Sequence, residues 1–213
     1  MKIDCLMLGE YQTNCYVLRS GEEATDCLVV DPGLGVEDLI AFLDEREIAP
    51  VAVLLTHGHI DHIAGIGALR RSYPDIKVLI HELDAGMLSD SATNLSDLMG
   101  PGFPPWRTEP ADVVLKDGSW IEQAGVRLQV LHVPGHSPGG ICLYSSEKGI
   151  VFTDDALFAE SIGRTDFPGG SMSRLVGCIR EKLWPLPDET VVYPGHGPQT
   201  TIAREKACNP FLQ

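Results

Sequence analysis

Residues 56–62 read Thr-His-Gly-His-Ile-Asp-His and place three histidines and one aspartate within six positions. Neutral imidazole and carboxylate are the usual protein ligands of zinc and similar ions, so this spacing predicts a metal site. In an extended chain, residues two apart point to the same side, so His57 and His59 can reach one ion. Asp61 and His62 fall where the chain is expected to turn into a helix, and we expect them to hold a second ion nearby.

Three later segments carry similar side chains just after an expected strand. His136 and His196 each lie in a loop rich in proline and glycine, and a third strand ends on the aspartates Asp154 and Asp155. A strand is rigid, so it delivers the side chain at its end to a fixed place. We therefore expect these segments to complete the ligand set.

The rest of the chain alternates short apolar runs with amphipathic segments. Apolar runs bounded by turn residues indicate strands, and apolar residues at helical spacing indicate helices. Strands are expected at 3–8, 14–18, 27–30, 51–55, 77–80, 126–132, 141–144, 150–153 and 190–193, and helices at 36–47, 62–71, 172–183 and 202–207. Ser171 is the expected N-cap of the third helix. Two sheets packed face to face, with helices outside, would bury the apolar faces of these elements.

Residues 89–110 contain several glycines and prolines and show little periodicity. A long loop in a compact domain is often a functional lid, although a surface excursion would give the same pattern. Both interpretations stay open at this point. In the first of them, Trp106 is a candidate for the wall of a substrate pocket.

The formal net charge is −14, from 16 basic and 30 acidic residues. An acidic surface repels phosphate backbones and anionic membranes, so we expect no nucleic acid and no membrane as partner. No apolar run approaches the length of a membrane span, and the first residues lack the apolar stretch of a signal peptide. The six cysteines form no Cys-x-x-Cys pair, and we expect them to be reduced core residues of a cytoplasmic protein. The oligomeric state leaves no signal in the sequence.

The His-x-His-x-Asp-His pattern, followed in order by His136, the aspartate pair and His196, resembles metallo-β-lactamase-fold hydrolases. Small glyoxalase II-like enzymes are the subgroup that it resembles, and the resemblance covers essentially the whole chain. It implies an α/β (α+β) protein with the four-layer αββα sandwich of that fold. It also implies one domain over residues 1–213, with a metal site at one edge.

The resemblance also implies a role for each matching residue. Seven residues correspond to metal ligands: His57, His59 and His136 for the first ion, Asp61, His62 and His196 for the second, and Asp155 as the bridge between them. The family pattern reads Thr-Gly-Asp where this chain has Thr153-Asp154-Asp155. Asp154 therefore takes the glycine position, which leaves open which of the two carboxylates coordinates, and Asp155 is the one that aligns as the bridge.

Two divalent ions about 3.5–4 Å apart can share a bridging water and lower its pKa toward about 7. The resulting hydroxide would attack an acyl carbon, one ion would stabilise the developing oxyanion, and Asp61 could orient the hydroxide as a catalytic residue. The expected function is thus hydrolysis of a thioester or related acyl bond in a small-molecule substrate. Zinc fits a histidine-rich site, and iron and manganese accept the same ligands. Only 17 residues follow His196, too few for the helical domain with which full-length glyoxalase II enzymes hold glutathione.

Other functions on the same fold remain as alternatives. A mononuclear iron oxidoreductase of the persulfide dioxygenase type would use only part of the ligand set. A nuclease of the superfamily would need basic residues to bind nucleic acid, and the net charge of −14 argues against that function. Hydrolysis of β-lactams is an alternative as a side activity. A non-catalytic binding module would not need all seven ligands.

Five further residues receive weaker predictions. His132 shares a strand face with apolar residues and is expected to be a core histidine, with support of a ligand as the alternative. His81 is expected to be structural. Asp31 is either a turn former or a partner of the metal-binding histidines. Arg164 either pairs with a carboxylate and braces the loop of the site or meets the substrate, and the brace is the favoured interpretation. The last of the five is Trp106, described above.

Overall fold

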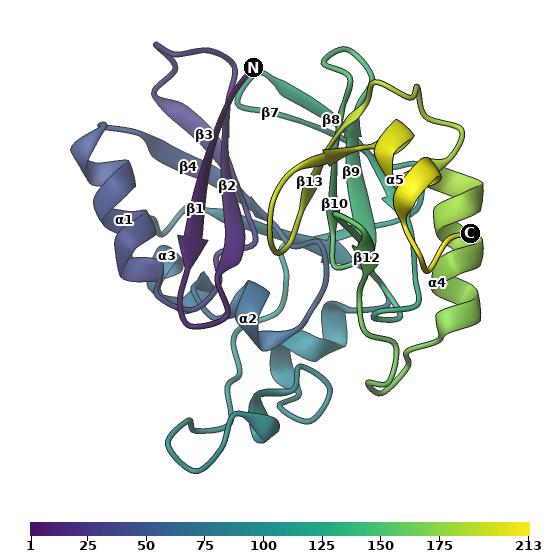
Figure 1. The fold of residues 1–213 in the computed structure, drawn as a ribbon. Helices are drawn as coiled ribbons and strands as arrows, with labels where there is room; N and C mark the ends of the chain where they lie inside the picture. Colours follow the sequence, from purple (N-terminus) through teal and green to yellow (C-terminus); the bar gives the residue numbers. More distant parts are fainter. The chain divides into compact units, whose positions relative to one another are not determined.

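The structure is a computed structural model, and it describes all 213 residues. The chain divides into two compact units (Figure 1). The first unit consists of residues 1–115 and 122–127, and the second of residues 116–121 and 128–213. Each unit is described by itself below. The single domain over residues 1–213 stays a prediction.

The first unit contains a six-stranded sheet with the strand order β1-β2-β3-β4-β5-β6. Its strands are β1 (Lys2–Leu8), β2 (Thr13–Arg19), β3 (Asp26–Val30), β4 (Ala49–Leu54), β5 (Lys77–His81) and β6 (Val113–Leu115). The first three strands pair antiparallel, and β3 through β6 pair parallel. The parallel part aligns the carboxyl ends of its strands at one edge of the sheet, and the histidine-rich segment follows one of those ends.

The helices of the first unit are α1 (Val36–Glu45), α2 (Ile60–Ile63) and α3 (Ile66–Ser72), with 3-10 turns η1 (Ala85–Ser89) and η2 (Ser96–Leu98). The single helix expected over 62–71 is wrong, because α2 and α3 are separated at Gly65. The Gly65 N–H donates to the Pro32 carbonyl at 2.8 Å, and a Cβ at this position would overlap Val36. This contact interrupts the helix and confines Asp61 and His62 to one short turn.

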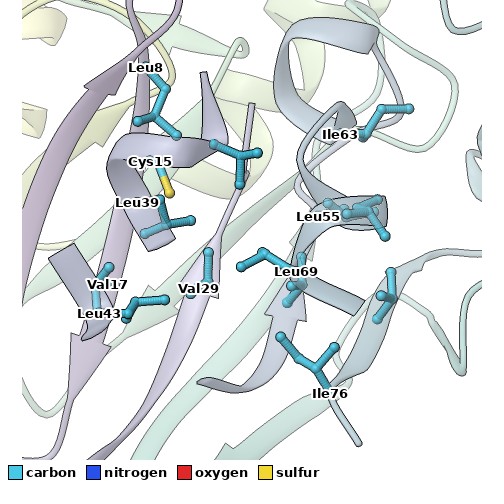
Figure 2. Close-up of a cluster of buried hydrophobic side chains, with 14 of the residues drawn as sticks. Leu8, Cys15, Val17, Val29, Leu39, Leu43, Leu55, Ile63, Leu69 and Ile76 are labelled. Carbon is cyan, nitrogen blue, oxygen red and sulfur yellow. The ribbon is translucent and has the colours of Figure 1, made fainter. Parts of the chain in front are cut away.

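One face of the first sheet packs against α1 and α3. The residues involved alternate along the strands, so Val17, Val29 and Val53 all point to the same side. They meet Leu39 of α1 and Leu69 of α3 in one buried cluster, of which Figure 2 shows a part. Each of these side chains contributes about 1.5–3 kcal/mol when it is fully buried. This cluster holds the end of β4 in place for the residues that follow it.

The second sheet has the strand order β14-β13-β10-β9-β8-β7. Its strands are β7 (Trp120–Gln123), β8 (Val126–His132), β9 (Ile141–Ser145), β10 (Ile150–Asp154), β13 (Val191–Pro194) and β14 (Thr200–Thr201). A separate two-stranded ribbon contains β11 (Leu157–Phe158) and β12 (Ser161–Ile162). Strands β10 and β13 are parallel neighbours, so their carboxyl ends lie beside each other.

The helical elements of the second unit are α4 (Met172–Cys178), a π-helical continuation η3 (Ile179–Leu183) and α5 (Ile202–Cys208). Figure 1 shows α4 and α5 beside the strands of the second sheet. The predicted N-cap is confirmed, because the Ser171 hydroxyl accepts from the Arg174 N–H at 3.4 Å. Leu175, Ile179 and Ile202 pack with strand residues in the core of this unit.

All six cysteines are free thiols, but only three of them are buried. Cys15, Cys27 and Cys142 are buried, whereas Cys5 and Cys208 are exposed, so the expectation that every cysteine is a core residue is wrong. Burial raises the pKa of the Cys27 thiol to about 12. The pKa values of the Cys15 and Cys142 thiols are raised well above the ordinary value by the same loss of solvation.

No helix of this chain combines the length and the apolar character that crossing a membrane requires.

Candidate metal centre

The candidate metal ligands fall into two groups by their position in the chain, called here the first and the second ligand set. The first comprises His57, His59, Asp61 and His62, which follow the end of β4. His57 and His62 are fully buried, and His59 is 3% exposed. The His57 Nε2 and His59 Nδ1 atoms lie 3.0 Å apart, so the two rings aim nitrogen atoms at the same small volume. The pair predicted to share an ion is thus brought together.

Asp61 and His62 occupy the first turn of α2. The Asp61 Oδ2 atom lies 3.3 Å from His62 Nε2, and one ligand atom of each lies within 4.8 Å of the other. The His62 ring is also close to the His57 ring, with 4.3 Å between their centroids. All four members of the first ligand set therefore gather at one end of β4.

Asp31 orients one of these histidines. Its Oδ2 atom lies 3.3 Å from His62 Nδ1 and accepts the Thr56 hydroxyl at 2.6 Å, while Oδ1 accepts the Thr56 N–H at 2.9 Å. Asp31 is buried and has a φ of 52°, a left-handed conformation that aspartate tolerates better than most residues. A carboxylate at Nδ1 favours the tautomer that keeps Nε2 free for a metal ion. Of the two roles expected for Asp31, the partner of a histidine is confirmed.

Three residues that the sequence did not single out also contact the backbone of residues 57–62. The Asp84 Oδ2 atom accepts the Gly58 N–H at 3.2 Å, and the Asn94 carbonyl accepts the Ile60 N–H at 2.8 Å. Met87 packs directly on Gly58, where a Cβ would overlap its side chain. A lone aspartate, methionine or asparagine carries no motif, so nothing in the sequence marked these three residues.

The second ligand set comprises His136, Asp155 and His196, which follow β8, β10 and β13. The Asp155 Oδ2 atom lies 3.5 Å from His136 Nε2, and Oδ1 lies 3.7 Å from His196 Nε2. The two oxygens of one carboxylate thus face two different imidazoles. This arrangement suits a carboxylate that bridges two cations.

Asp154 has a different environment from Asp155. Its φ is 49°, in the left-handed region that glycine adopts without strain, and its carbonyl accepts the Gly195 N–H at 3.1 Å. This backbone conformation explains why the glyoxalase II-like pattern has glycine at the position of Asp154. Asp155 is the residue that lies between His136 and His196, and its role as the bridge stays a prediction.

A backbone carbonyl orients His136. The Arg164 carbonyl oxygen lies 2.8 Å from His136 Nδ1, and because a carbonyl only accepts, Nδ1 must carry the proton. The lone pair of His136 is then on Nε2, the atom that faces Asp155. The Arg164 guanidinium points elsewhere: it forms two hydrogen bonds to Asp166, at 3.0 and 2.8 Å, and lies over the Phe167 ring. The expected pair with a carboxylate is present, with Asp166 of the same loop, and the Arg164 carbonyl orients His136 in addition.

The two remaining histidines differ from each other. His132 is only partly buried, and its Nε2 atom lies 3.0 Å from the Pro138 carbonyl in the loop that carries His136. The expectation of a core histidine is therefore wrong, and the contact fits the alternative, support of a ligand loop. His81 is buried at the end of β5, where its Nδ1 atom accepts the Leu83 N–H at 3.4 Å, as expected for a structural residue.

Residues 8–196 match the model of the metallo-beta-lactamase superfamily. The chain belongs to this superfamily. Membership supports a metal-dependent hydrolase and confirms the predicted fold class.

Curated members of the superfamily match the whole chain. It is 36% identical to "Probable metallo-hydrolase YqgX" of Bacillus subtilis over 212 residues, which cover 100% of this chain and 98% of that protein. It is 34% identical to "Hydroxyacylglutathione hydrolase GloC" of Haemophilus influenzae over 213 residues, with 100% and 98% coverage.

Solved structures of the superfamily agree. The "BLEG-1 B3 metallo-beta-lactamase" has a TM-score of 0.92 and 39% identity, with 99% of both chains covered. "TTHA1623 in a di-iron-bound form" has a TM-score of 0.86 and 36% identity, with 98% of this chain and 100% of that chain covered. "ETHE1 from Myxococcus xanthus" has a TM-score of 0.79 and 31% identity, with 99% and 84% covered.

The donor atoms of both ligand sets suit divalent metal ions. Imidazole nitrogens and carboxylate oxygens are accepted by zinc, iron and manganese, whereas magnesium and calcium prefer oxygen alone. In each set a histidine ring has one nitrogen fixed by the protein, His62 by Asp31 and His136 by Arg164. The residues present therefore fit divalent cations.

Proposed function

We propose that this chain is a two-metal hydrolase that cleaves a thioester or a related acyl bond in a small-molecule substrate. The observation that carries the proposal is the position of Asp155, whose two carboxylate oxygens face His136 and His196 separately. A hydrolase that uses one ion needs no carboxylate in a bridging position. The proposed ligands are His57, His59 and His136 for one ion, Asp61, His62 and His196 for the other, and Asp155 for both.

Two divalent ions supply a hydroxide nucleophile at neutral pH and polarise the acyl carbonyl. The chain itself supplies the orientation of the ligands. The Arg164 carbonyl accepts the Nδ1 proton of His136, and the Asp31 carboxylate lies 3.3 Å from His62 Nδ1, so Nε2 of each ring is the proposed ligand atom. Asp61, at the first turn of α2, is proposed to orient the nucleophile through its carboxylate.

Thioesters are the proposed substrate class because the chain resembles glyoxalase II-like enzymes and is similar to GloC over its full length. Lactoylglutathione is the substrate to test first. The proposal includes no nucleic acid or membrane partner, in line with the net charge of −14, and a cytoplasmic location. Zinc is the proposed metal, and the di-iron-bound form of TTHA1623 makes iron the first alternative.

The test begins with elemental analysis of protein purified without added metal. About two ions of zinc, iron or manganese per chain are expected, together with hydrolysis of lactoylglutathione faster than that of a generic thioester. Asp155→Asn removes the charge of a proposed ligand. Asp166→Asn is the matched control, because it removes the charge of an exposed carboxylate near His136. Two ions per chain in Asp155→Asn would contradict the proposed bridge. Equal rates on both thioesters would remove the case for lactoylglutathione.

A persulfide dioxygenase is the second candidate, because the likeness to ETHE1 also extends over 99% of this chain. About one iron per chain, no second metal, and oxygen uptake with glutathione persulfide would favour it. Thioester hydrolysis without oxygen uptake would exclude it.

A further inference from the structure

Residues 84–106, which we name the clasp segment, contact the metal-binding turn of residues 57–62 at three points. The Asp84 carboxylate accepts the Gly58 N–H, the Met87 side chain packs on the Gly58 backbone, and the Asn94 carbonyl accepts the Ile60 N–H. The segment includes most of the loop for which the sequence left a lid and a surface excursion open. Its contacts with the metal-binding turn are those of a structural support.

Asn94 is the centre of the clasp segment. It is 0% exposed, and its side-chain amide donates to the Met87 carbonyl at 2.9 Å and to the Trp106 carbonyl at 3.1 Å. Its Oδ1 atom accepts the Ser96 N–H at 3.0 Å. The Ser96 hydroxyl in turn accepts the Trp106 N–H at 2.9 Å. One buried side chain thereby fixes the backbone at both ends of the segment.

The main chain of Asn94 acts on the metal-binding turn. The first N–H groups of a helix have no partner within the helix, and a capping side chain usually accepts them. At the start of α2 the N-cap residue is His59, whose side chain makes no capping bond. The Asn94 carbonyl accepts the N–H of Ile60, the first residue of α2, at 2.8 Å. It therefore satisfies one of the N–H groups for which α2 itself has no acceptor.

We propose that Asn94 is a positioning residue for the metal centre and that it couples the metal-binding turn to Trp106. Its carbonyl sets the start of α2, whose first turn carries Asp61 and His62. Its side-chain amide fixes the position of the Trp106 carbonyl. A displacement of Asn94 therefore moves the ligand turn and the Trp106 end of the clasp segment together. This inference rests on the metal ligands given under the proposed function.

The test compares Asn94→Ala with Asn209→Ala. Asn209 is also 0% exposed, its side-chain amide donates to the Ser161 carbonyl at 3.0 Å, and its Oδ1 atom accepts the Phe211 N–H at 3.1 Å. Both variants lose a buried amide with similar bonds, but only Asn94 contacts the metal-binding turn. Zinc affinity is measured on metal-stripped protein by competition with a chromophoric chelator. Hydrogen exchange of the Ile60 and Trp106 amides is followed with and without zinc.

Removal of groups that orient metal ligands weakens metal binding by about 10–100-fold, and Asn94→Ala is expected to fall in this range. Zinc should slow exchange at Ile60 and Trp106 in the wild type but not in Asn94→Ala. Asn209→Ala should lower Tm while it keeps the wild-type zinc affinity and the wild-type exchange pattern. If Asn94→Ala does not fold, Asn94→Asp gives the same comparison, because it keeps the side-chain volume and the acceptor for Ser96 and loses both amide donations.

Wild-type affinity in the folded Asn94 variant would overturn the inference and leave the proposed function intact. A loss of affinity in Asn209→Ala as large as that in Asn94→Ala would also overturn it, since general destabilisation would then be the cause. Wild-type protein that binds no zinc, iron or manganese would overturn the proposed function, and the inference with it.

Discussion

The two ligand sets differ in how the chain brings their side chains together. The first lies within six consecutive positions after β4, and its three histidines are at most 3% exposed. The second draws one residue from the end of each of β8, β10 and β13, and the His196 side chain is 27% exposed. The histidines of the first set are deeply buried, whereas His196 of the second set is partly exposed and its other two members are buried.

This difference shows what each set depends on. The first needs a local backbone path, the end of a strand followed by a short helical turn, and single contacts from Asp31 and Asn94 stabilise that path. The second needs the register of a sheet, because only the parallel pairing of β10 with β13 brings Asp155 beside His196. Substitutions near the first set should therefore act on one turn, whereas the second set responds to the backbone of several strands.

The largest effect is expected at Asp155 in the second set. Asp155→Asn removes the charge of the proposed bridge, and a loss of about 4 kcal/mol in transition-state stabilisation lowers kcat/KM about a thousandfold. Asp154→Asn is the matched control, because asparagine tolerates the left-handed conformation and its neighbour keeps both oxygens. Metal content and thioester kinetics of both variants would check this. If Asp154→Asn were the more damaging change, the bridge would be assigned to the wrong aspartate.

A smaller effect is expected at Asp31, behind the first set. Asp31→Ala removes the carboxylate at His62 Nδ1, so the ring loses its fixed tautomer and the affinity for metal should fall about 10–100-fold. Chelator competition measures this fall, and added zinc should restore much of the activity. Activity that no concentration of zinc restores would show that Asp31 has a role beyond the orientation of His62.

Two glycines, one beside each ligand set, allow the sets to be compared by the free energy of unfolding. A Cβ on Gly33 would overlap the Asp61 carbonyl oxygen, and a Cβ on Gly163 would overlap the Asp155 carbonyl oxygen. Because backbone atoms must move in both cases, Gly33→Ala and Gly163→Ala should each lower the free energy of unfolding by about 1–3 kcal/mol. Denaturant titration checks the size of the loss. A neutral result at either glycine would mean that this carbonyl can shift freely.

The smallest effect is expected at the side chain of Arg164. The guanidinium pairs with Asp166 on the surface, and the atom that contacts His136 is the backbone carbonyl, which alanine retains. Arg164→Ala should therefore keep the wild-type metal content and Tm, because an exposed ion pair adds little to stability. Loss of metal in this variant would contradict the backbone role. A raised KM with unchanged metal content would reveal contact of the guanidinium with substrate.

The sequence indicated which histidines and aspartates lie together better than it indicated the residues that support them. The first set was evident because its residues are contiguous, and the second because each residue follows an apolar run that forms a strand. The roles of Asp84 and Asn94 arise only when the chain brings residues 26 and 34 positions away onto Gly58 and Ile60, which no local pattern reports. The break between α2 and α3 escaped prediction for the same reason, since the Pro32 carbonyl that interrupts the helix is distant in sequence.

Short elements were the other source of error. Strand β6 consists of only three residues, Val113–Leu115, which is shorter than the apolar runs that indicate a strand, and its pairing with β5 defines it. The pattern of elements already favoured two packed sheets with helices outside, and the resemblance named this arrangement as the αββα sandwich, which the superfamily match supports. Local patterns thus predicted where the strands end, and the family resemblance indicated that the residues after those ends bind metal together.

The buried thiols have a consequence for side reactions. A thiolate, not a thiol, takes an acyl group from a thioester, and a pKa of about 12 leaves roughly one Cys27 thiol in a hundred thousand ionised at pH 7. The pKa values of Cys15 and Cys142 are also raised well above the ordinary value. These three cysteines cannot compete with water as acyl acceptors. If the proposed thioester hydrolysis holds, these three thiols would not become acylated by the substrate.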